Sequence, residues 1–94
     1  MRLLEQEINL IKEKVQEIFG LSVVYLFGSR VDDKKRGGDI DLYIVPQERE
    51  NLFLKKMKIK TLLEDILYKP IDIVIAQDKT RLIEQEALQY GVKL

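Results

Sequence analysis

DIDLYIV, residues 39–45, is an apolar run interrupted by two carboxylates. Asp is a poor strand former, and a carboxylate on a half-buried strand needs a partner or a cation. Because side chains alternate along a strand, Asp39 and Asp41 are expected on the same face, about 7 Å apart. The stretch therefore predicts a strand with a paired-carboxylate site, at a spacing that suits two cations sharing ligands.

Two other apolar runs carry polar residues that fit the same site. IDIVIA, residues 71–76, contains Asp72, and VVYLF, residues 23–27, is followed directly by Gly28 and Ser29. Gly lets the backbone approach a phosphate, and Ser offers a hydroxyl at a turn whose amides can face anionic oxygen. A lone Asp-x-Asp would be a solvated strand end, and a lone Gly-Ser a turn with a Ser cap. Together they indicate a site for phosphate chemistry.

The composition narrows the kind of cation that this site would hold. The chain has no Cys and no His, the residues that dominate zinc, copper and iron sites. Oxygen ligands favour a hard divalent ion, Mg²⁺ or Mn²⁺, and Mg²⁺ typically lies between carboxylates and substrate phosphates. We therefore expect a nucleoside triphosphate as the ligand.

Length and charge limit the class of protein. The 94 residues predict one domain, 1–94, without room for a separate acceptor-binding domain. Sixteen basic and sixteen acidic residues give no net charge, which argues against direct DNA binding. The absence of Cys, and of an apolar block at the start of the sequence, predicts a cytoplasmic protein without a membrane segment.

Hydrophobic periodicity predicts three helices. The first covers about residues 2 to 19 and ends at Gly20, and the second covers about residues 49 to 67. The third is expected to begin at an Asp78 N-cap and to end at Gly91. The expected buried faces comprise Leu4, Ile8, Ile11, Val15 and Ile18 in the first helix, Ile59, Leu62, Leu63, Ile66 and Leu67 in the second, and Ile83, Ala87 and Tyr90 in the third.

The acidic residues can meet only in one arrangement of the strands. The first strand must run antiparallel to the second, and the second parallel to the third through a right-handed crossover. The expected fold class is α/β (α+β), a small mixed β-sheet with helices packed mainly on one face. The segments are strands at 23–27, 39–45 and 71–76 and a short helical turn with a loop at 30–38, whereas residues 92–94 are too few to assign but could add a brief edge strand.

Other polar and aromatic residues have ordinary interpretations. Tyr25, Tyr43, Tyr68 and Tyr90 have the spacing of core or core-edge residues. Basic residues in the second helix point around it, which indicates an exposed helical surface; these are Lys55, Lys56, Lys58 and Lys60.

GSR at residues 28–30, DIDL at 39–42 and Asp72 together resemble the active-site signature of the DNA polymerase beta nucleotidyltransferase superfamily. The size is similar to that of its minimal members, the MNT-domain proteins, which include MntA antitoxins paired with HEPN-domain toxins. The likeness covers nearly the whole chain and extends to EALQYGV at residues 86–92.

This resemblance implies a nucleotidyltransferase fold and a role for each residue of the signature. Asp39, Asp41 and Asp72 would bind two Mg²⁺ ions, with Asp72 also a candidate base toward the acceptor hydroxyl. Gly28 and Ser29 would contact the nucleotide phosphates. Arg30 would either neutralise phosphate charge or be an exposed, solvated residue.

The resemblance also implies a reaction and a partner. Some members transfer AMP from ATP to a Tyr of the partner HEPN toxin and thereby neutralise it. The alternative is a binding module that masks a toxin by contact, with little or no catalysis. Transfer to a small molecule is less favoured, because relatives of that kind carry a further domain, unless a homodimer supplies the missing wall.

Overall fold

The computed structural model describes residues 3–28 and 40–94 of the chain. The strand at 39–45 is described from Ile40 onward, and the turn expected at 30–38 lies outside the described residues. The elements in chain order are α1 (Glu5–Phe19), β1 (Ser22–Phe27), β2 (Ile40–Pro46), α2 (Leu52–Leu67), β3 (Ile71–Ile75), α3 (Leu82–Tyr90) and β4 (Val92–Lys93).

The four described strands form one mixed sheet in the order β3-β2-β1-β4. β1 pairs antiparallel with β2 and with β4, and β2 pairs parallel with β3. The predicted strand directions are therefore confirmed, and the residues after Gly91, too few to assign from the sequence, form the edge strand β4. α2 makes the connection between the parallel strands, because a parallel pair needs a long crossover.

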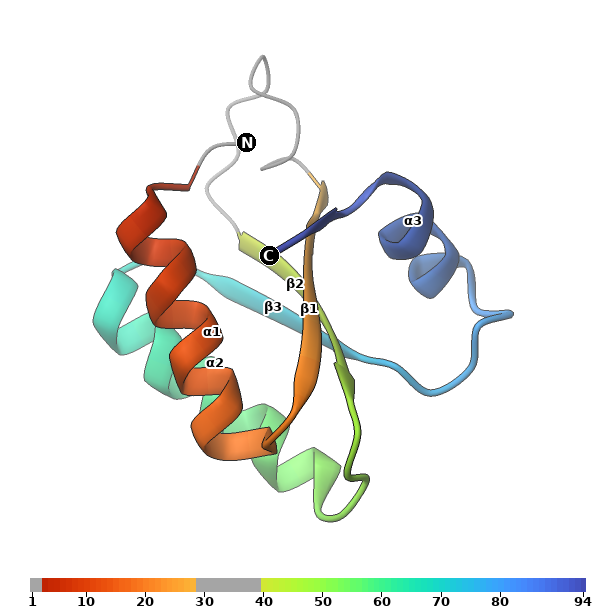
Figure 1. The fold of residues 1–94 in the computed structure, drawn as a ribbon, viewed down its shortest axis with the longest axis horizontal. Helices are drawn as coiled ribbons and strands as arrows, with labels where there is room; N and C mark the ends of the chain where they lie inside the picture. Colours follow the sequence, from red (N-terminus) through yellow and green to blue (C-terminus); the bar gives the residue numbers. More distant parts are fainter. Residues whose placement is uncertain (1–2, 29–39) are drawn as a thin grey trace.

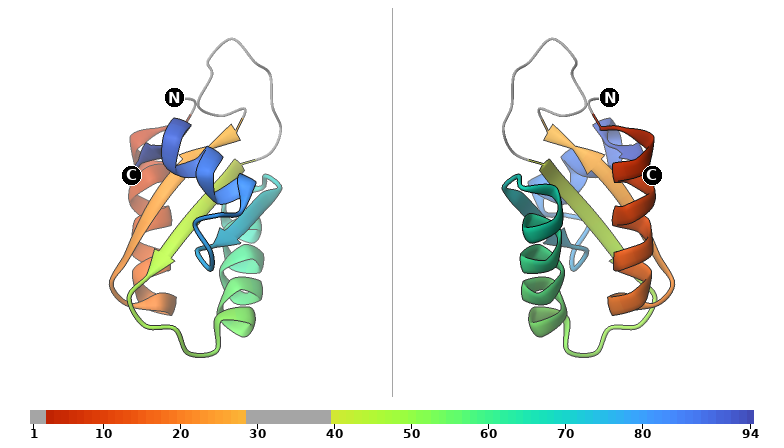
Figure 2. Two further views of the ribbon diagram at one scale, coloured as in Figure 1. Left: turned by 90° about the vertical axis from the view of Figure 1, so that its right-hand side faces the viewer. Right: turned by 90° about the vertical axis from the view of Figure 1, so that its left-hand side faces the viewer.

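Helices lie on both faces of this sheet, in unequal numbers (Figures 1 and 2). α1 and α2 pack side by side on one face, where the main apolar core includes Ile11, Val15, Ile59 and Leu63. α3 covers part of the other face, where Ala87 packs in a smaller cluster of buried residues. Two of the three described helices thus share one face, as the sequence predicts. No helix of the described chain combines the length and apolar character needed to cross a membrane.

The helices begin later than predicted. α1 starts at Glu5 instead of residue 2, and α2 at Leu52 instead of residue 49. Asp78 does not cap α3, because its carboxylate accepts hydrogen bonds from the amide and the hydroxyl of Thr80 and forms a separate turn. The helix ends are closer to prediction, since Gly20 and Gly91 are the C-caps of α1 and α3.

Some residues that were expected in the core lie on the surface. Tyr68 is 90% exposed in the left-handed cap that ends α2, and Tyr90 is 66% exposed in the last turn of α3. Leu4 is also exposed because it precedes α1 as its N-cap. Periodicity alone misplaces such residues, since a helix end turns away from the face that the helix interior packs against.

We predict that truncating a core residue of β2 destabilises the fold strongly. Leu42 is fully buried between β1 and β3. The Leu42→Ala variant should lose about 2 to 5 kcal/mol of unfolding free energy, measured by urea denaturation. Leu54→Ala, at a residue that is 68% exposed, is the matched control and should change stability by about 0.5 kcal/mol or less. Equal losses in the two variants would contradict the assignment of the core.

Candidate functional site

The register of the sheet brings together three of the residues that the sequence predicts. Phe27, the residue before Gly28, pairs with Asp41 across β1 and β2. Asp41 in turn pairs with Asp72 across β2 and β3. Gly28, Asp41 and Asp72 therefore lie side by side at one end of the sheet, where β1 ends and β2 and β3 begin.

Both carboxylates project from the same face of the sheet. Ile40 and Leu42 belong to the core under α1 and α2, as do Ile71 and Ile73. Because side chains alternate, Asp41 and Asp72 project from the opposite face, the one that α3 partly covers. Neighbouring strands are about 5 Å apart, so the two carboxylates can contribute oxygen atoms to one cation.

Gly28 is held against Asp41. Its φ of 78° lies in the region that residues with a side chain rarely adopt. A Cβ atom at this position would lie 2.2 Å from Oδ2 of Asp41. A Cβ at this position would therefore force the Asp41 carboxylate to move, and the positive φ independently favours Gly at the turn.

Lys60 holds the start of β3 beside Asp72. Its ammonium donates to the carbonyl of Ile71 and lies 3.1 Å from Oε2 of Glu64 and 4.0 Å from Oδ1 of Asp72. Glu64 accepts the amide of Ile71 at 3.0 Å, and this hydrogen bond, with that from Lys60, lowers the pKa of the Glu64 carboxyl. For Lys60, the prediction of an exposed helical residue is therefore wrong, because its side chain reaches the sheet edge.

Glu84 was not identified from the sequence and is the buried carboxylate of α3. It is fully buried and accepts hydrogen bonds from the amide of Asp78 at 2.9 Å, that of Gln77 at 3.1 Å and the Tyr43 hydroxyl at 2.8 Å. Arg81 adds a contact at 3.2 Å. Burial alone would raise the pKa of the Glu84 carboxyl, but the hydrogen bonds that the charged carboxylate accepts outweigh this effect and lower the pKa. The sequence feature that could have identified Glu84 is its position in the first turn of a helix, where unpaired backbone amides favour a carboxylate.

This contact joins α3 to the strand that carries Asp41. Tyr43 lies two residues after Asp41, so it faces the same way, and it is 1% exposed. Its prediction as a core residue is confirmed. Burial, followed by the hydrogen bond to Glu84, raises the pKa of the Tyr43 hydroxyl to about 12. The Tyr43–Glu84 pair thus fixes the face of the sheet behind the carboxylates.

The other predicted site residues, Ser29, Arg30 and Asp39, lie outside the described residues. Within residues 3–28 and 40–94 no group of three or more acidic residues is placed to hold a metal ion. The described part of the site is thus the Gly28, Asp41 and Asp72 arrangement.

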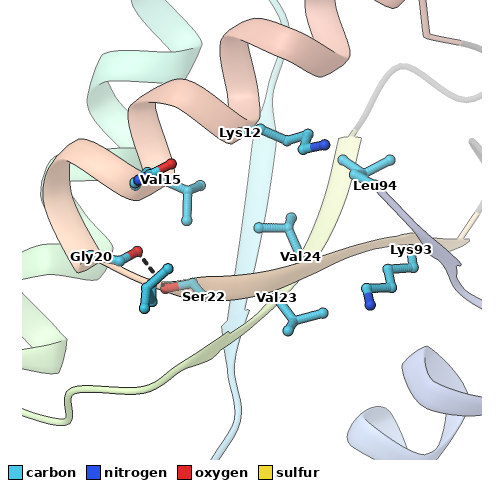
Figure 3. Close-up of a pocket in the computed structure, with 10 residues that line it drawn as sticks. Lys12, Val15, Gly20, Ser22, Val23, Val24, Lys93 and Leu94 are labelled. Atoms are coloured by element: carbon cyan, nitrogen blue, oxygen red, sulfur yellow. Dashed lines mark hydrogen bonds between the residues drawn. The ribbon is translucent and has the colours of Figure 1, made fainter.

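A pocket of about 270 Å³ lies elsewhere, between α1, β1 and the end of the chain at Lys93 and Leu94 (Figure 3). Val15 and Val24 form part of its apolar wall, and Lys12 and Leu94 face each other at its rim. Neither Asp41 nor Asp72 lines it. The pocket is therefore separate from the carboxylate site.

Comparison with known proteins gives a family and a fold. The family model described as polymerase beta, nucleotidyltransferase, matches residues 9–94. A crystal structure described as the toxin-antitoxin with AMP-PNP is 19% identical, with a TM-score of 0.75, and the match covers 97% of this chain and 72% of that chain. A structure of a tri-AMPylated Shewanella oneidensis HEPN toxin in complex with an MNT antitoxin is 18% identical, with a TM-score of 0.71, and the match covers 95% of this chain and 69% of that chain. A crystal structure of the MntA-HepT toxin-antitoxin is 17% identical, with a TM-score of 0.71, and the match covers 96% of this chain and 70% of that chain. No curated protein matched the sequence.

We predict that Gly28→Ala disturbs the carboxylate site beyond its effect on stability. The new methyl group would collide with the Asp41 carboxylate, so binding of Mn²⁺ with ATP should weaken by about tenfold or more in calorimetric titration. Gly20→Ala is the matched control, because Gly20 also has a positive φ, 76°, with nothing within 4 Å of the added Cβ. Both variants should lose about 1 to 3 kcal/mol of stability, but Gly20→Ala should bind as wild type does. Equal weakening in both would contradict the contact.

A second prediction concerns alkaline pH. The pKa of Tyr43 is 10.0 in the unfolded chain and about 12 in the fold, so its contribution to stability is complete below pH 10 and is lost as pH rises toward 12. Tyr43→Phe should destabilise the protein at pH 8 by about 1 to 3 kcal/mol, because Glu84 loses a donor. Between pH 10 and 12 the variant should lose less further stability than wild type in urea titrations. Parallel losses would show that Tyr43 is not the group responsible.

Proposed function

The chain belongs to the polymerase beta nucleotidyltransferase family, and on this basis we propose that it transfers AMP from ATP to a hydroxyl group of a partner protein. The observation that carries the proposal is the alignment of Gly28, Asp41 and Asp72 at one end of the sheet. A turn with a Gly against paired carboxylates can bring triphosphate oxygens and a divalent cation together.

Mg²⁺ fits the donor set of this site. Asp41 and Asp72 offer hard oxygen ligands on neighbouring strands, and we propose Asp39 as the third carboxylate and Asp39 and Asp41 as the pair shared by two ions. Bound Mg²⁺ would supply positive charge to offset that of the triphosphate. Gly28, Ser29 and Arg30 are the residues that we expect to hold the phosphates.

The proposed reaction is an in-line displacement at the α-phosphorus of ATP. The acceptor oxygen forms a bond to the α-phosphorus, while the bond from that phosphorus to the oxygen bridging to the β-phosphate breaks. Pyrophosphate leaves with the bonding electrons, and the hydroxyl proton passes to the Asp72 carboxylate. Asp72 is suited to this role because its side chain is 62% exposed and so can meet an acceptor from outside.

We further propose that the acceptor is a Tyr of a HEPN-domain toxin and that the chain is its antitoxin, in the cytoplasm. The support is the likeness in fold to the antitoxin complexes, one of which holds a tri-AMPylated HEPN toxin.

The test is transfer of label from α-labelled ATP, in the presence of Mg²⁺, to the product of the neighbouring gene, which the proposal expects to be a HEPN-domain protein. The Asp39→Asn and Asp41→Asn variants should lose transfer by about a hundredfold or more, because each removes a cation ligand. Asp72→Asn should lose a comparable amount, because it removes a carboxylate that we propose both as a cation ligand and as the base toward the acceptor hydroxyl. Asp65→Asn, an exposed position on α2, is the matched control and should retain full activity.

Two outcomes would overturn the proposal in different ways. Transfer that persists in Asp41→Asn would contradict the assigned site. Neutralisation of the toxin by Asp41→Asn without any transfer would favour the alternative, a module that acts by binding alone.

A further inference from the structure

Among the described strands β3 is an edge strand with a free side, since it lies at the end of the order β3-β2-β1-β4. The Ala76 amide donates to the Ile44 carbonyl, and the Ile40 amide donates to the Pro70 carbonyl. Even-numbered residues of β3 therefore bond to β2, and the amides and carbonyls of Ile71, Ile73 and Ile75 point away from it. An edge of this kind is a template for another extended chain.

The described chain closes one end of this edge. There the Ile71 amide donates to Glu64 and the Ile71 carbonyl accepts from Lys60. At the other end Arg49 donates to the Ala76 carbonyl, which lies on the side of β2, as the Ala76 amide does, so this bond leaves the free side open. Beyond Ile71, the outward amides and carbonyls of Ile73 and Ile75 have no hydrogen-bond partner among residues 3–28 and 40–94. The open length thus offers two donors and two acceptors.

A pocket lies beside this open length. It has a volume of about 180 Å³, and its lining includes Leu52, Phe53, Lys56, Ile73, Ile75 and Arg81. The Phe53 side chain is 73% exposed at its rim, which is unusual for a large aromatic residue without a partner. Unpaired backbone groups and an adjoining side-chain pocket on one edge are the two elements of peptide recognition by strand addition.

The charges around the pocket select the kind of peptide. Lys56 and Arg81 line it, although Arg81 also contacts the Glu84 carboxylate at 3.2 Å, and Arg49 lies at the adjoining end of β3. Asp78, the nearest acidic residue along the chain after β3, is engaged by the amide and hydroxyl of Thr80. The lining of the pocket thus carries two cationic side chains and no acidic one. An acidic segment complements them.

We propose that the Ile73–Ile75 edge of β3 is a docking site for an extended segment of a partner protein in which apolar and acidic residues alternate. The segment adds a strand beside β3, an apolar side chain enters the pocket against Phe53, and acidic side chains pair with Lys56 and Arg81. This surface is distinct from the carboxylate site at Asp41 and Asp72 and does not depend on nucleotide transfer.

The proposal is tested with synthetic eight-residue peptides that alternate Val, Ile, Phe or Tyr with Asp or Glu. Binding to the ¹⁵N-labelled chain is followed by amide hydrogen exchange and chemical shifts at Ile73 and Ile75. At least one acidic peptide should protect both amides, and its charge-reversed counterpart with Lys should not. N-methylation of the peptide amides that face β3 should abolish the protection, because it removes the donors that a strand must supply.

Matched surface variants distinguish binding at this edge from nonspecific electrostatic attraction of an acidic peptide to the helix surface. Phe53→Ser and Lys56→Glu should each weaken binding by about tenfold or more, because they alter the pocket and its charge. Leu54→Ser and Lys58→Glu, on the same helix but outside the pocket lining, should change it by about twofold or less. Asp41→Asn should bind the peptide as wild type does, so that failure of nucleotide transfer and failure of docking are told apart.

Three results would overturn the proposal. The first is the absence of saturable binding by every acidic peptide of the set. The second is binding that survives both N-methylation and Lys56→Glu. The third is protection of Ile73 and Ile75 by the chain itself as its concentration rises, which would assign the edge to a second copy.

Discussion

The pairing of β2 with both of its neighbours is the constraint on which the structure depends. One register places Phe27 opposite Asp41 and Asp41 opposite Asp72, and the same register buries Ile40, Leu42 and Ile44 under α1 and α2. A slip of one residue would move every side chain of β2 to the other face. The apolar core therefore specifies the position of the carboxylates, although it does not contact an acceptor or a nucleotide.

The opposite face of the sheet is fixed by polar contacts more than by apolar area. The smaller cluster there has few fully buried residues, and α3 is attached through Glu84, whose carboxylate joins Tyr43 to the amides of Gln77 and Asp78. A buried carboxylate is costly without partners, and here it has several. The contact positions α3 while leaving the end of the sheet near Asp41 and Asp72 uncovered by it.

Lys60 and Glu64 contact both the backbone of β3 at its free edge and the region of the Asp72 side chain. They close the backbone of Ile71 at the sheet edge, and the Lys60 ammonium also lies near the Asp72 carboxylate. The end of β3 that carries Asp72 is thereby protected from strand addition, while the following residues of the same edge remain open in the described part of the chain. One edge strand can thus carry a reaction site and a docking site without competition between them.

The sequence by itself determined three of the strands, their directions and the meeting of Asp41 with Asp72. An Asp in an apolar strand needs a partner or a cation, and a right-handed crossover helix allows few arrangements of the strands. Only the tertiary structure decided that Gly28 abuts Asp41, that Lys60 reaches β3 and that Glu84 is buried. Each of these contacts joins residues from different elements or turns a polar side chain inward. Periodicity describes which face of an element is apolar, whereas the partner of a buried charge is set by how the elements pack.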